Sequence, residues 1–172
     1  MTQPRAVIVG APGAGKTSVG RALSKAWRVD FRDTDADVEA RAGKSVSDIF
    51  VNDGEPHFRN LERDAVADAL AEHEGVLALG GGAILDESTR ALLAGHVVVW
   101  LNVGLSDAVK RVGLSSARPM LLGNVRGTML RLMQEREPLY REVATVEIET
   151  DGRAISDIVA DVVSGLPRSA HA

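Results

Sequence analysis

Short apolar runs alternate along the chain with longer segments in which apolar residues recur at helical spacing. The apolar runs are rich in β-branched residues, as buried strands are, and they lie at 6–9, 76–79, 97–101 and 143–148. A helical pattern from Lys16 to Trp27 follows the first run closely. Because strands that alternate with helices form parallel sheets covered by helices, the pattern predicts a three-layer α/β fold.

The region between the first two of these runs is long and mostly helical. A short segment at 29–32 is the expected second strand, and helical stretches follow around 35–42, 45–52 and 55–74. Gly43 and Gly54 separate these stretches, as helix-breaking residues do. We therefore expect a helical insertion that binds the substrate, at about 34–62.

The second half of the chain predicts a lid loop and a closing helix. Helical patterns at 104–112 and 127–136 flank a linker at about 113–124, which has glycine near both ends and carries Arg118-Pro119. This composition is typical of a mobile loop. A last helix is expected at 155–166, followed by a frayed tail at 167–172. With 172 residues and no internal repeat, the chain fits a single domain at 1–172.

Composition and charge exclude several classes of function. The formal net charge of −4 argues against a strongly basic nucleic-acid surface, and the lack of cysteine excludes disulfides and a cysteine nucleophile. The apolar run at 6–9 is too short for a signal peptide, and no run approaches the ~18 residues that a membrane helix needs. We expect a soluble cytoplasmic protein without nucleic-acid or membrane partners.

A phosphate-binding loop follows the first predicted strand. Residues 10–17, GAPGAGKT, match G-x-x-x-x-G-K-[ST] in full, between a strand and a helix as this motif requires. The glycines let backbone N–H groups face the phosphates, Lys16 bridges the β- and γ-phosphates, and the Thr17 hydroxyl suits Mg²⁺. We expect ATP to contact this loop and the helix after it through Gly13, Ala14, Gly15, Lys16, Thr17 and Ser18.

The rest of the sequence narrows the kind of P-loop protein. A GTPase needs an Asn-Lys-x-Asp element to recognise guanine, and the sequence contains none. A nucleic-acid ATPase would show an apolar strand that ends in acidic residues, whereas the strands at 76–79 and 97–101 are followed by glycines and by Asn102. A small-molecule kinase remains.

An Asp-Thr-Asp sequence follows the predicted second strand. Two carboxylates one residue apart can divide their work, with Asp33 facing Mg²⁺ and Asp35 facing the acceptor hydroxyl. The alternative is that Asp33 or Thr34 only caps the next helix.

Several other polar positions are candidates for substrate binding. Arg59 and Glu62 share one helical face, so Glu62 can orient the guanidinium, although such a pair is often only a surface salt bridge. Gly80-Gly81-Gly82 allows a close approach of the backbone to a ligand, or forms only a flexible turn. Arg118 can reach the γ-phosphate from the lid, and Arg136 is expected to end a helix.

Together these motifs resemble the shikimate kinase family in their order and spacing over nearly the whole chain. The motifs are the P-loop, Asp-Thr-Asp, Phe-Arg-x-x-Glu, Gly-Gly-Gly, the lid Arg-Pro and Arg-x-Pro-Leu-Tyr. The resemblance implies a nucleoside-monophosphate-kinase-like fold with a five-stranded parallel sheet. It also implies ATP- and Mg²⁺-dependent phosphorylation of the 3-hydroxyl of shikimate, on the route to chorismate and the aromatic amino acids. We expect a monomer.

The resemblance assigns a role to each candidate residue. It implies Lys16, Asp35 and Arg118 as catalytic residues, Thr17 with Asp33 as the metal site, and Arg111 with Arg153 beside adenine. The implied shikimate ligands are Asp35, Phe58, Arg59, Gly80, Gly81, Gly82 and Arg136, with Phe50 as an additional apolar wall. Two arginines suit the carboxylate of shikimate, because a guanidinium binds a carboxylate through two parallel hydrogen bonds.

Two other functions remain open at this point. A gluconate kinase or another small-metabolite kinase would share the phosphate loop and the lid. A nucleotide-binding regulatory module would keep the loop without turnover. Shikimate-dependent formation of ADP separates these functions from that of a shikimate kinase.

Overall fold

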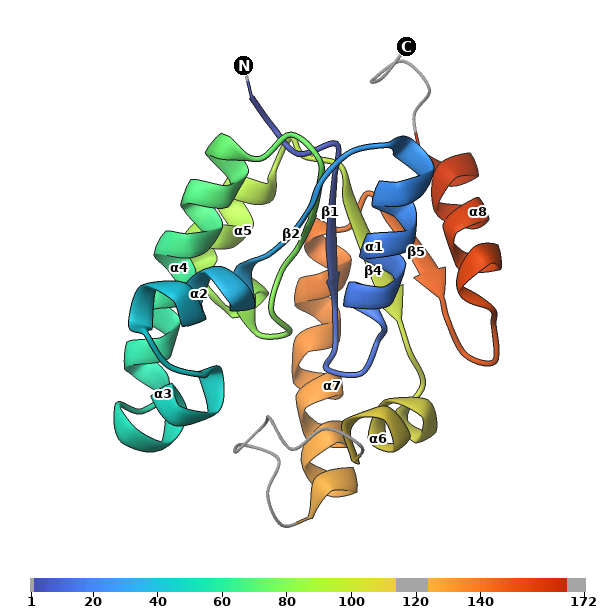
Figure 1. Cartoon of the computed structure of the whole chain (residues 1–172). Helices are drawn as coiled ribbons and strands as arrows, with labels where there is room; N and C mark the ends of the chain where they lie inside the picture. The colour runs from blue at the N-terminus through green and yellow to red at the C-terminus, as the bar shows by residue number, and fades with distance from the viewer. Residues whose placement is uncertain (1, 114–123, 167–172) are drawn as a thin grey trace.

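A computed structural model describes residues 2–113 and 124–166 of the chain (Figure 1). Its centre is a parallel sheet with the strand order β2-β3-β1-β4-β5. The strands are β1 (Ala6–Gly10), β2 (Phe31–Asp33), β3 (Val76–Ala78), β4 (Val98–Asn102) and β5 (Val146–Glu149). In the centre of the sheet Ile8 pairs with Ala78 on one side and Val99 on the other. The expected α/β fold with a five-stranded parallel sheet is confirmed.

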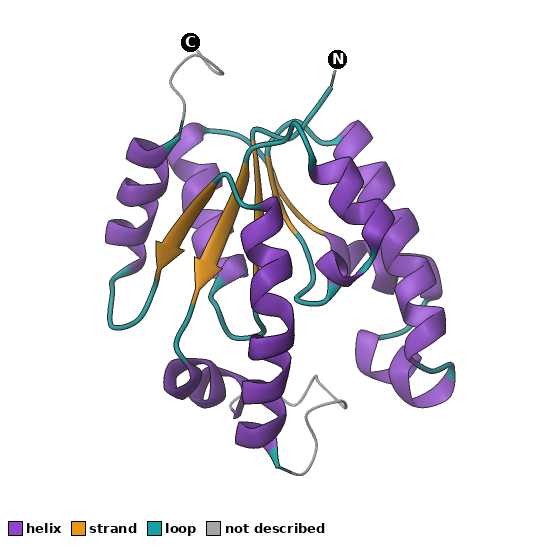
Figure 2. Ribbon diagram, turned by 180° about the vertical axis from the view of Figure 1, so that it is seen from behind, coloured by secondary structure: helices purple, strands orange, loops and turns teal. Residues whose placement is uncertain are grey.

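Helices cover both faces of this sheet. The helices are α1 (Lys16–Trp27), α2 (Thr34–Ala42), α3 (Val46–Asn52), α4 (Glu55–Glu72), α5 (Glu87–Leu93), α6 (Leu105–Gly113), α7 (Val125–Val143) and α8 (Ile155–Gly165), with a short 3-10 helix at Ala83–Leu85. Figure 1 shows α1 and α8 together on one face, and Figure 2 shows α7 crossing the other.

The alternation of side chains in β1 explains this three-layer arrangement. Ile8 belongs to an apolar cluster with Leu23 of α1 and Val162 of α8. Its neighbour Val7 belongs to a second cluster, on the opposite face, with Val66 of α4. Because successive side chains of a strand point to opposite faces, one apolar strand can stabilise two helical layers.

The segment of α2, α3 and the start of α4 has an apolar cluster of its own. Val38, Ile49 and Phe58 are buried in it, and Phe50 packs against it. Gly43 ends α2 with a φ of 70°, and the side chain of Ser45 caps α3. The predicted helical stretches of this region are confirmed, and the cluster gives them a fixed position at the edge of the sheet.

The end of α7 differs from the sequence prediction. The predicted helix at 127–136 continues through Pro138 to Val143, so the expected end at Arg136 and the expected strand start at 143 are wrong. The buried side chains Met129, Arg136 and Tyr140 continue one helical stripe past the proline. Pro138 is exposed, and packing along this stripe outweighs the one helical hydrogen bond that the proline lacks.

Two smaller differences are local. The second strand begins at Phe31 and not at Val29, since Arg28 adopts a left-handed conformation that ends α1 and delays the strand. Helix α5 is absent from the predicted elements, although the side chain of Asp86 caps it by accepting hydrogen bonds from Ser88 N and Thr89 N. Within the described residues, no helix combines the length and the apolar character that crossing a membrane requires.

Candidate active site

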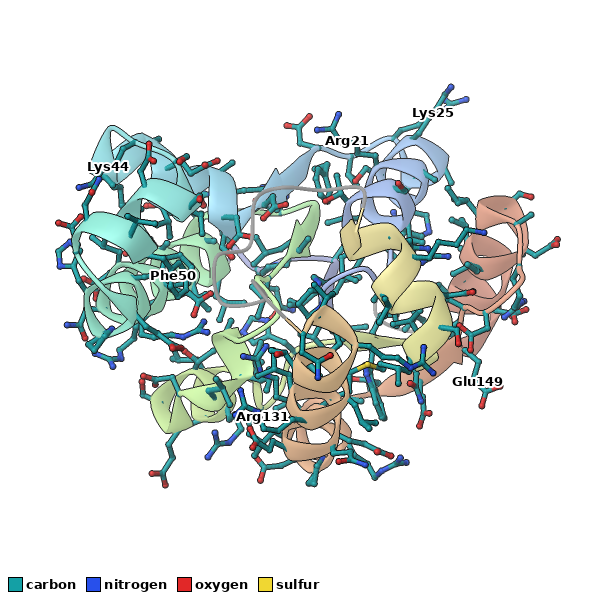
Figure 3. All side chains as sticks on the ribbon, turned by 90° about the horizontal axis from the view of Figure 1, so that it is seen from below. Arg21, Lys25, Lys44, Phe50, Arg131 and Glu149 are labelled. Carbon is teal, nitrogen blue, oxygen red and sulfur yellow. The ribbon has the colours of Figure 1, made fainter. Side chains whose placement is uncertain are left out.

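Three loops meet at the carboxyl end of the sheet. They follow β1, β2 and β3, which lie side by side in the order β2-β3-β1. In open parallel sheets this edge is where ligands bind. Figure 3 looks onto this edge from below, with Lys44, between α2 and α3, and Phe50 of α3 on the left and α7, which carries Arg131, at the lower centre. The loops bring the phosphate motif, Asp-Thr-Asp and the glycine run to one place.

The phosphate loop is shaped by its glycines. Gly13 and Gly15 have φ angles of 83° and 90°, which residues with a side chain rarely adopt. Lys16 Nζ donates hydrogen bonds to Gly10 O at 2.9 Å and Ala11 O at 3.0 Å, so its ammonium group lies over the loop. The first turn of α1 carries no acidic residue and no side-chain cap. Its positive end therefore suits a phosphate.

The Asp-Thr-Asp segment begins α2 and contacts the glycine run. Asp33 Oδ1 accepts a hydrogen bond from Asp35 N at 2.9 Å, so the proposed capping of α2 is confirmed for Asp33. Thr34 is buried, and its hydroxyl accepts a hydrogen bond from Gly80 N at 3.3 Å. This bond joins the loops after β2 and β3 and leaves Asp35 to face the pocket.

Thr17 and Asp33 have the chemistry that Mg²⁺ prefers. A hydroxyl and a carboxylate are hard oxygen donors, the type of ligand that Mg²⁺ binds in proteins. Across 2–113 and 124–166, no group of three or more His, Cys, Asp or Glu side chains could hold a metal. Mg²⁺ in kinases is usually held by few protein groups together with phosphate oxygens and water. The donor set therefore fits Mg²⁺ bound together with a nucleotide.

A polar pocket lies between the phosphate loop, the glycine run and the helical insertion. Its lining contains every residue predicted to bind shikimate, together with Pro12, Phe50 and Glu62. The predicted residues that line it are Asp35, Phe58, Arg59, Gly80, Gly81, Gly82 and Arg136. The rings of Phe50 and Phe58 lie 4.7 Å apart and form an apolar wall. The lining residues come from six separate segments of the chain: the phosphate loop, α2, α3, α4, the glycine run and α7.

Arg59 is held by two carboxylates. Its Nη1 lies 2.8 Å from Glu62 Oε1, and its Nη2 lies 3.2 Å from Glu55 Oε2. Glu62 is only 3% exposed, so the alternative of a solvated surface pair is wrong. Burial raises the pKa of Glu62, and the charge of Asp35 adds to this, while Arg59 and Arg136 oppose it. The pair therefore orients Arg59 inside the pocket wall.

The glycine run is packed too closely for side chains. A Cβ atom at Gly80 would lie 2.7 Å from Asp35 Oδ1 and 2.8 Å from Glu62 Oε2. A Cβ atom at Gly82 would lie 2.7 Å from Cζ of Arg59. Real Cβ atoms essentially never approach so closely, so a side chain at either glycine would displace the ends of Asp35, Glu62 or Arg59, and the run is more than a flexible turn.

A second pocket adjoins the start of α1. It is lined by Ala14, Gly15, Ser18, Val19, Arg111, Arg153, Ile155 and Ile158. Arg111 donates to Gly13 O at 3.0 Å, and Arg153 donates to Asp161 at 2.6 Å and to Glu149 O at 3.0 Å. The structure thus brings both predicted adenine residues beside the phosphate loop, although they are 42 positions apart in the chain.

Two predicted features lie outside the described residues. They are positions 114–123 of the predicted lid, which include Arg118, and the predicted tail at 167–172. Pro12 lines the pocket but was not among the predicted pocket residues. Tyr140, four positions after Arg136 on the same helical face, is not part of the lining but contacts the glycine run through Gly81 O. In the sequence, Tyr140 was marked by that spacing and by its place in the Arg-x-Pro-Leu-Tyr motif.

The comparison with protein families decides where the chain belongs. A family model described as shikimate kinase matches residues 12–167. The chain belongs to the shikimate kinase family. Proteins named shikimate kinase from Thermobifida fusca and Salinispora tropica are each 56% identical to it, over 166 and 164 residues. These alignments cover 96% of the chain and 96% of the first protein, and 95% and 98% for the second.

Solved structures agree with this assignment to the shikimate kinase family. Shikimate kinase from Acinetobacter baumannii, in complex with shikimate, has a TM-score of 0.90 and 33% identity, and the alignment covers 95% of this chain and 92% of that one. A gluconokinase from Sinorhizobium meliloti has a TM-score of 0.57 and 21% identity, with coverage of 96% and 93%. The second similarity shows a shared fold alone.

Proposed function

We propose that this protein transfers the γ-phosphoryl group of ATP to the 3-hydroxyl of shikimate, forming shikimate 3-phosphate and ADP on the route to chorismate. The observation that carries this proposal is the contact between the phosphate loop and the acceptor pocket. Pro12 packs on Gly81 so closely that a Cβ atom at Gly81 would lie 3.0 Å from Pro12 Cδ. An acceptor in this pocket is therefore a direct neighbour of the nucleotide phosphates.

The charges of the pocket suit an anionic acceptor with hydroxyl groups. Arg59 and Arg136 both line it, and together they can bind a carboxylate. Asp35 and the backbone of the glycine run suit hydroxyl groups, while the wall of Phe50 and Phe58 suits a ring face. A neutral sugar would offer these two guanidinium groups no carboxylate to bind. Shikimate has the carboxylate, hydroxyl groups and ring that these residues require.

The proposed reaction is a single displacement. The acceptor oxygen attacks the γ-phosphorus, the bond from that phosphorus to the bridging oxygen of ADP breaks, and Asp35 accepts the hydroxyl proton. Phosphoryl transfer depends mainly on positioning and charge neutralisation. Lys16 supplies positive charge at the phosphates, and we propose that Arg118 supplies more. Mg²⁺, held by Thr17 and Asp33, would neutralise phosphate oxygens when bound.

The nucleotide base is assigned to the second pocket. Arg111 and Arg153 can contribute a guanidinium face, and Ile155 and Ile158 an apolar surface, to an adenine ring. Ile155 is 43% exposed, which suits a residue that a planar base covers. This lining supports the prediction, made from the family resemblance, that Arg111 and Arg153 both contact adenine.

Relatives of known name support the proposal over a gluconate kinase activity. The Acinetobacter baumannii enzyme is described as a complex with shikimate, and the relatives at 56% identity are named shikimate kinase. A gluconate kinase activity would rest on the gluconokinase fold alone. A monomeric state, a cytoplasmic location and the lack of nucleic-acid or membrane partners stay predictions.

An assay that couples ADP formation to NADH oxidation tests the proposal. We expect ADP formation with shikimate and almost none with gluconate or without an acceptor, and loss of turnover when EDTA removes Mg²⁺. Phosphorus NMR of the product identifies the phosphorylated hydroxyl. Turnover with gluconate only would support the alternative kinase, and nucleotide binding without any turnover would support a regulatory module.

A further inference from the structure

Tyr140 links the glycine run to helix α7 and strand β4. Its side chain is 2% exposed and lies on α7, one turn after Arg136. Its hydroxyl donates a short hydrogen bond to Gly81 O. Its ring stacks on Trp100 of β4, with ring centroids 5.8 Å apart and an angle of 22° between the planes. Tyr140 therefore holds the backbone of the acceptor pocket at Gly81 from helix α7.

This hydrogen bond selects one orientation of a peptide group. Gly81 and Gly82 have no side chains that could hold the peptide between them, and glycine accepts many backbone conformations. In a trans peptide the C=O and the following N–H point in opposite directions. When Tyr140 holds Gly81 O toward α7, the N–H of Gly82 must point to the other side of the glycine run.

The neighbours of the glycine run limit its position but not the direction of this peptide. Pro12 packs on Gly81, and the guanidinium of Arg59 packs on Gly82. Both contacts are made to the α-carbon side of the glycines and leave peptide rotation to be decided by hydrogen bonds. Among the described residues, the Tyr140 hydroxyl is the side chain that is bonded to Gly81 O.

The Tyr140 hydroxyl remains a donor under physiological conditions. Burial raises its pKa to about 12, although the nearby charge of Arg136 and a hydrogen bond with that guanidinium oppose the increase. The Trp100 ring fixes the plane of the phenol and the helix fixes its distance from the sheet. The donor is thus rigid and always protonated, as a positioning group needs to be.

We propose that Tyr140 is a positioning residue for the acceptor, which orients the Gly81–Gly82 peptide so that the backbone of the glycine run can hold a hydroxyl of shikimate. This inference rests on the proposed function. It assigns to Tyr140 an effect on shikimate that acts through Gly81, without direct contact with the reacting atoms.

Tyr140→Phe tests the inference because it removes one oxygen and keeps the ring stack on Trp100. We expect the KM for shikimate to rise about tenfold, with a smaller fall in kcat and with the KM for ATP within twofold of wild type. Calorimetric titration with shikimate in the absence of ATP should show the same loss of affinity. The melting temperature shows whether the variant is folded under the assay conditions.

Thr145→Val is the matched control. The Thr145 hydroxyl also bonds to the backbone, accepting from Val98 N at 2.9 Å, but at the opposite end of β4. We expect this variant to lose stability while its KM for shikimate stays unchanged.

The outcomes separate the inference from the proposed function. If wild type turns over shikimate and Tyr140→Phe has an unchanged KM for shikimate, or equal increases for shikimate and ATP, the positioning role is overturned and the proposed function stands. If wild type does not act on shikimate, the proposed function fails and the inference fails with it.

Discussion

The phosphate loop and the proposed acceptor pocket are both suited to anions, but they are built in different ways. The phosphate loop is one continuous segment, 10–17, in which backbone N–H groups, a helix end and one lysine do the work. The acceptor pocket takes its lining from positions as distant as Pro12 and Arg136. A local motif can therefore be changed one group at a time, whereas each change in the pocket also moves its neighbours.

The charged groups of the acceptor pocket are more deeply buried than those of the phosphate loop. Lys16 is half-buried and Thr17 is exposed, so water can solvate these groups when a neighbouring side chain is removed. Glu62 and Arg136 are 3% and 4% exposed. Buried charges are stable only with partners in good geometry, so the charged groups of the acceptor pocket depend on one another.

The largest effect is expected in the phosphate loop, where Lys16→Met removes a charge without disturbing the core. The charge stabilises the transferring phosphoryl group, so kcat should fall by about 10³-fold with an almost unchanged melting temperature. Steady-state kinetics and thermal unfolding measure the two quantities. Lys25→Met, on an exposed position of the same helix, should leave both at wild-type values. A Lys16→Met enzyme with more than a few per cent of wild-type turnover would contradict the role of this lysine.

A smaller loss of kcat is expected for Asp35→Asn in the lining of the acceptor pocket. Asparagine keeps the size of the side chain but loses the charge and the basicity, so kcat with shikimate should fall by about 10²-fold. The cap of α2 belongs to Asp33, so the melting temperature should change little. Asp37→Asn is the control on the same helix, because it breaks the 2.8 Å pair with Arg32 outside the pocket and should affect stability only. Normal turnover of Asp35→Asn would remove Asp35 from the reaction.

A substitution in the glycine run should weaken shikimate binding by displacing a neighbouring side chain of the acceptor pocket. Gly82 has an ordinary φ of −101°, so Gly82→Ala adds only a methyl group that collides with the guanidinium of Arg59. Misplacing a binding group by about 1 Å can cost up to ~10²-fold, and we expect the KM for shikimate to rise at least tenfold. The KM for ATP should not change. In Gly43→Ala the new methyl group meets no atom within 4 Å, and the left-handed backbone makes this variant a control for stability alone.

The smallest effect concerns the pH dependence of stability. The pKa of Glu62 is raised in the folded protein, so ionising this carboxyl is harder there than in the unfolded chain. Its favourable contribution is complete below the ordinary value of 4.5 and is lost as pH rises through the raised pKa. Urea unfolding should therefore show Glu62→Gln gaining stability relative to wild type between pH 4.5 and 8. A difference that is independent of pH, or that changes in the opposite direction, would show that pairing with Arg59 dominates over burial.

The sequence by itself determined the layer architecture and the phosphate loop. Alternating apolar strands and helical segments suffice for a parallel sheet with helices on both faces, because both periods are local properties of the chain. The P-loop is equally local, since its glycines, lysine and threonine act at fixed spacing within eight positions. For the acceptor pocket, local patterns offered Asp35, Arg59 and the glycine run only as candidates, and the resemblance to a family gave them their roles.

Tertiary structure alone decided how those pocket members act together. It buried Glu62 beside Arg59, packed Gly82 on the same guanidinium and brought Pro12 onto Gly81. It also extended α7 beyond Pro138, so that Tyr140 reached Gly81 O. No local period encodes these contacts, because each joins segments far apart in the chain whose distance is set by the packing of helices on the sheet.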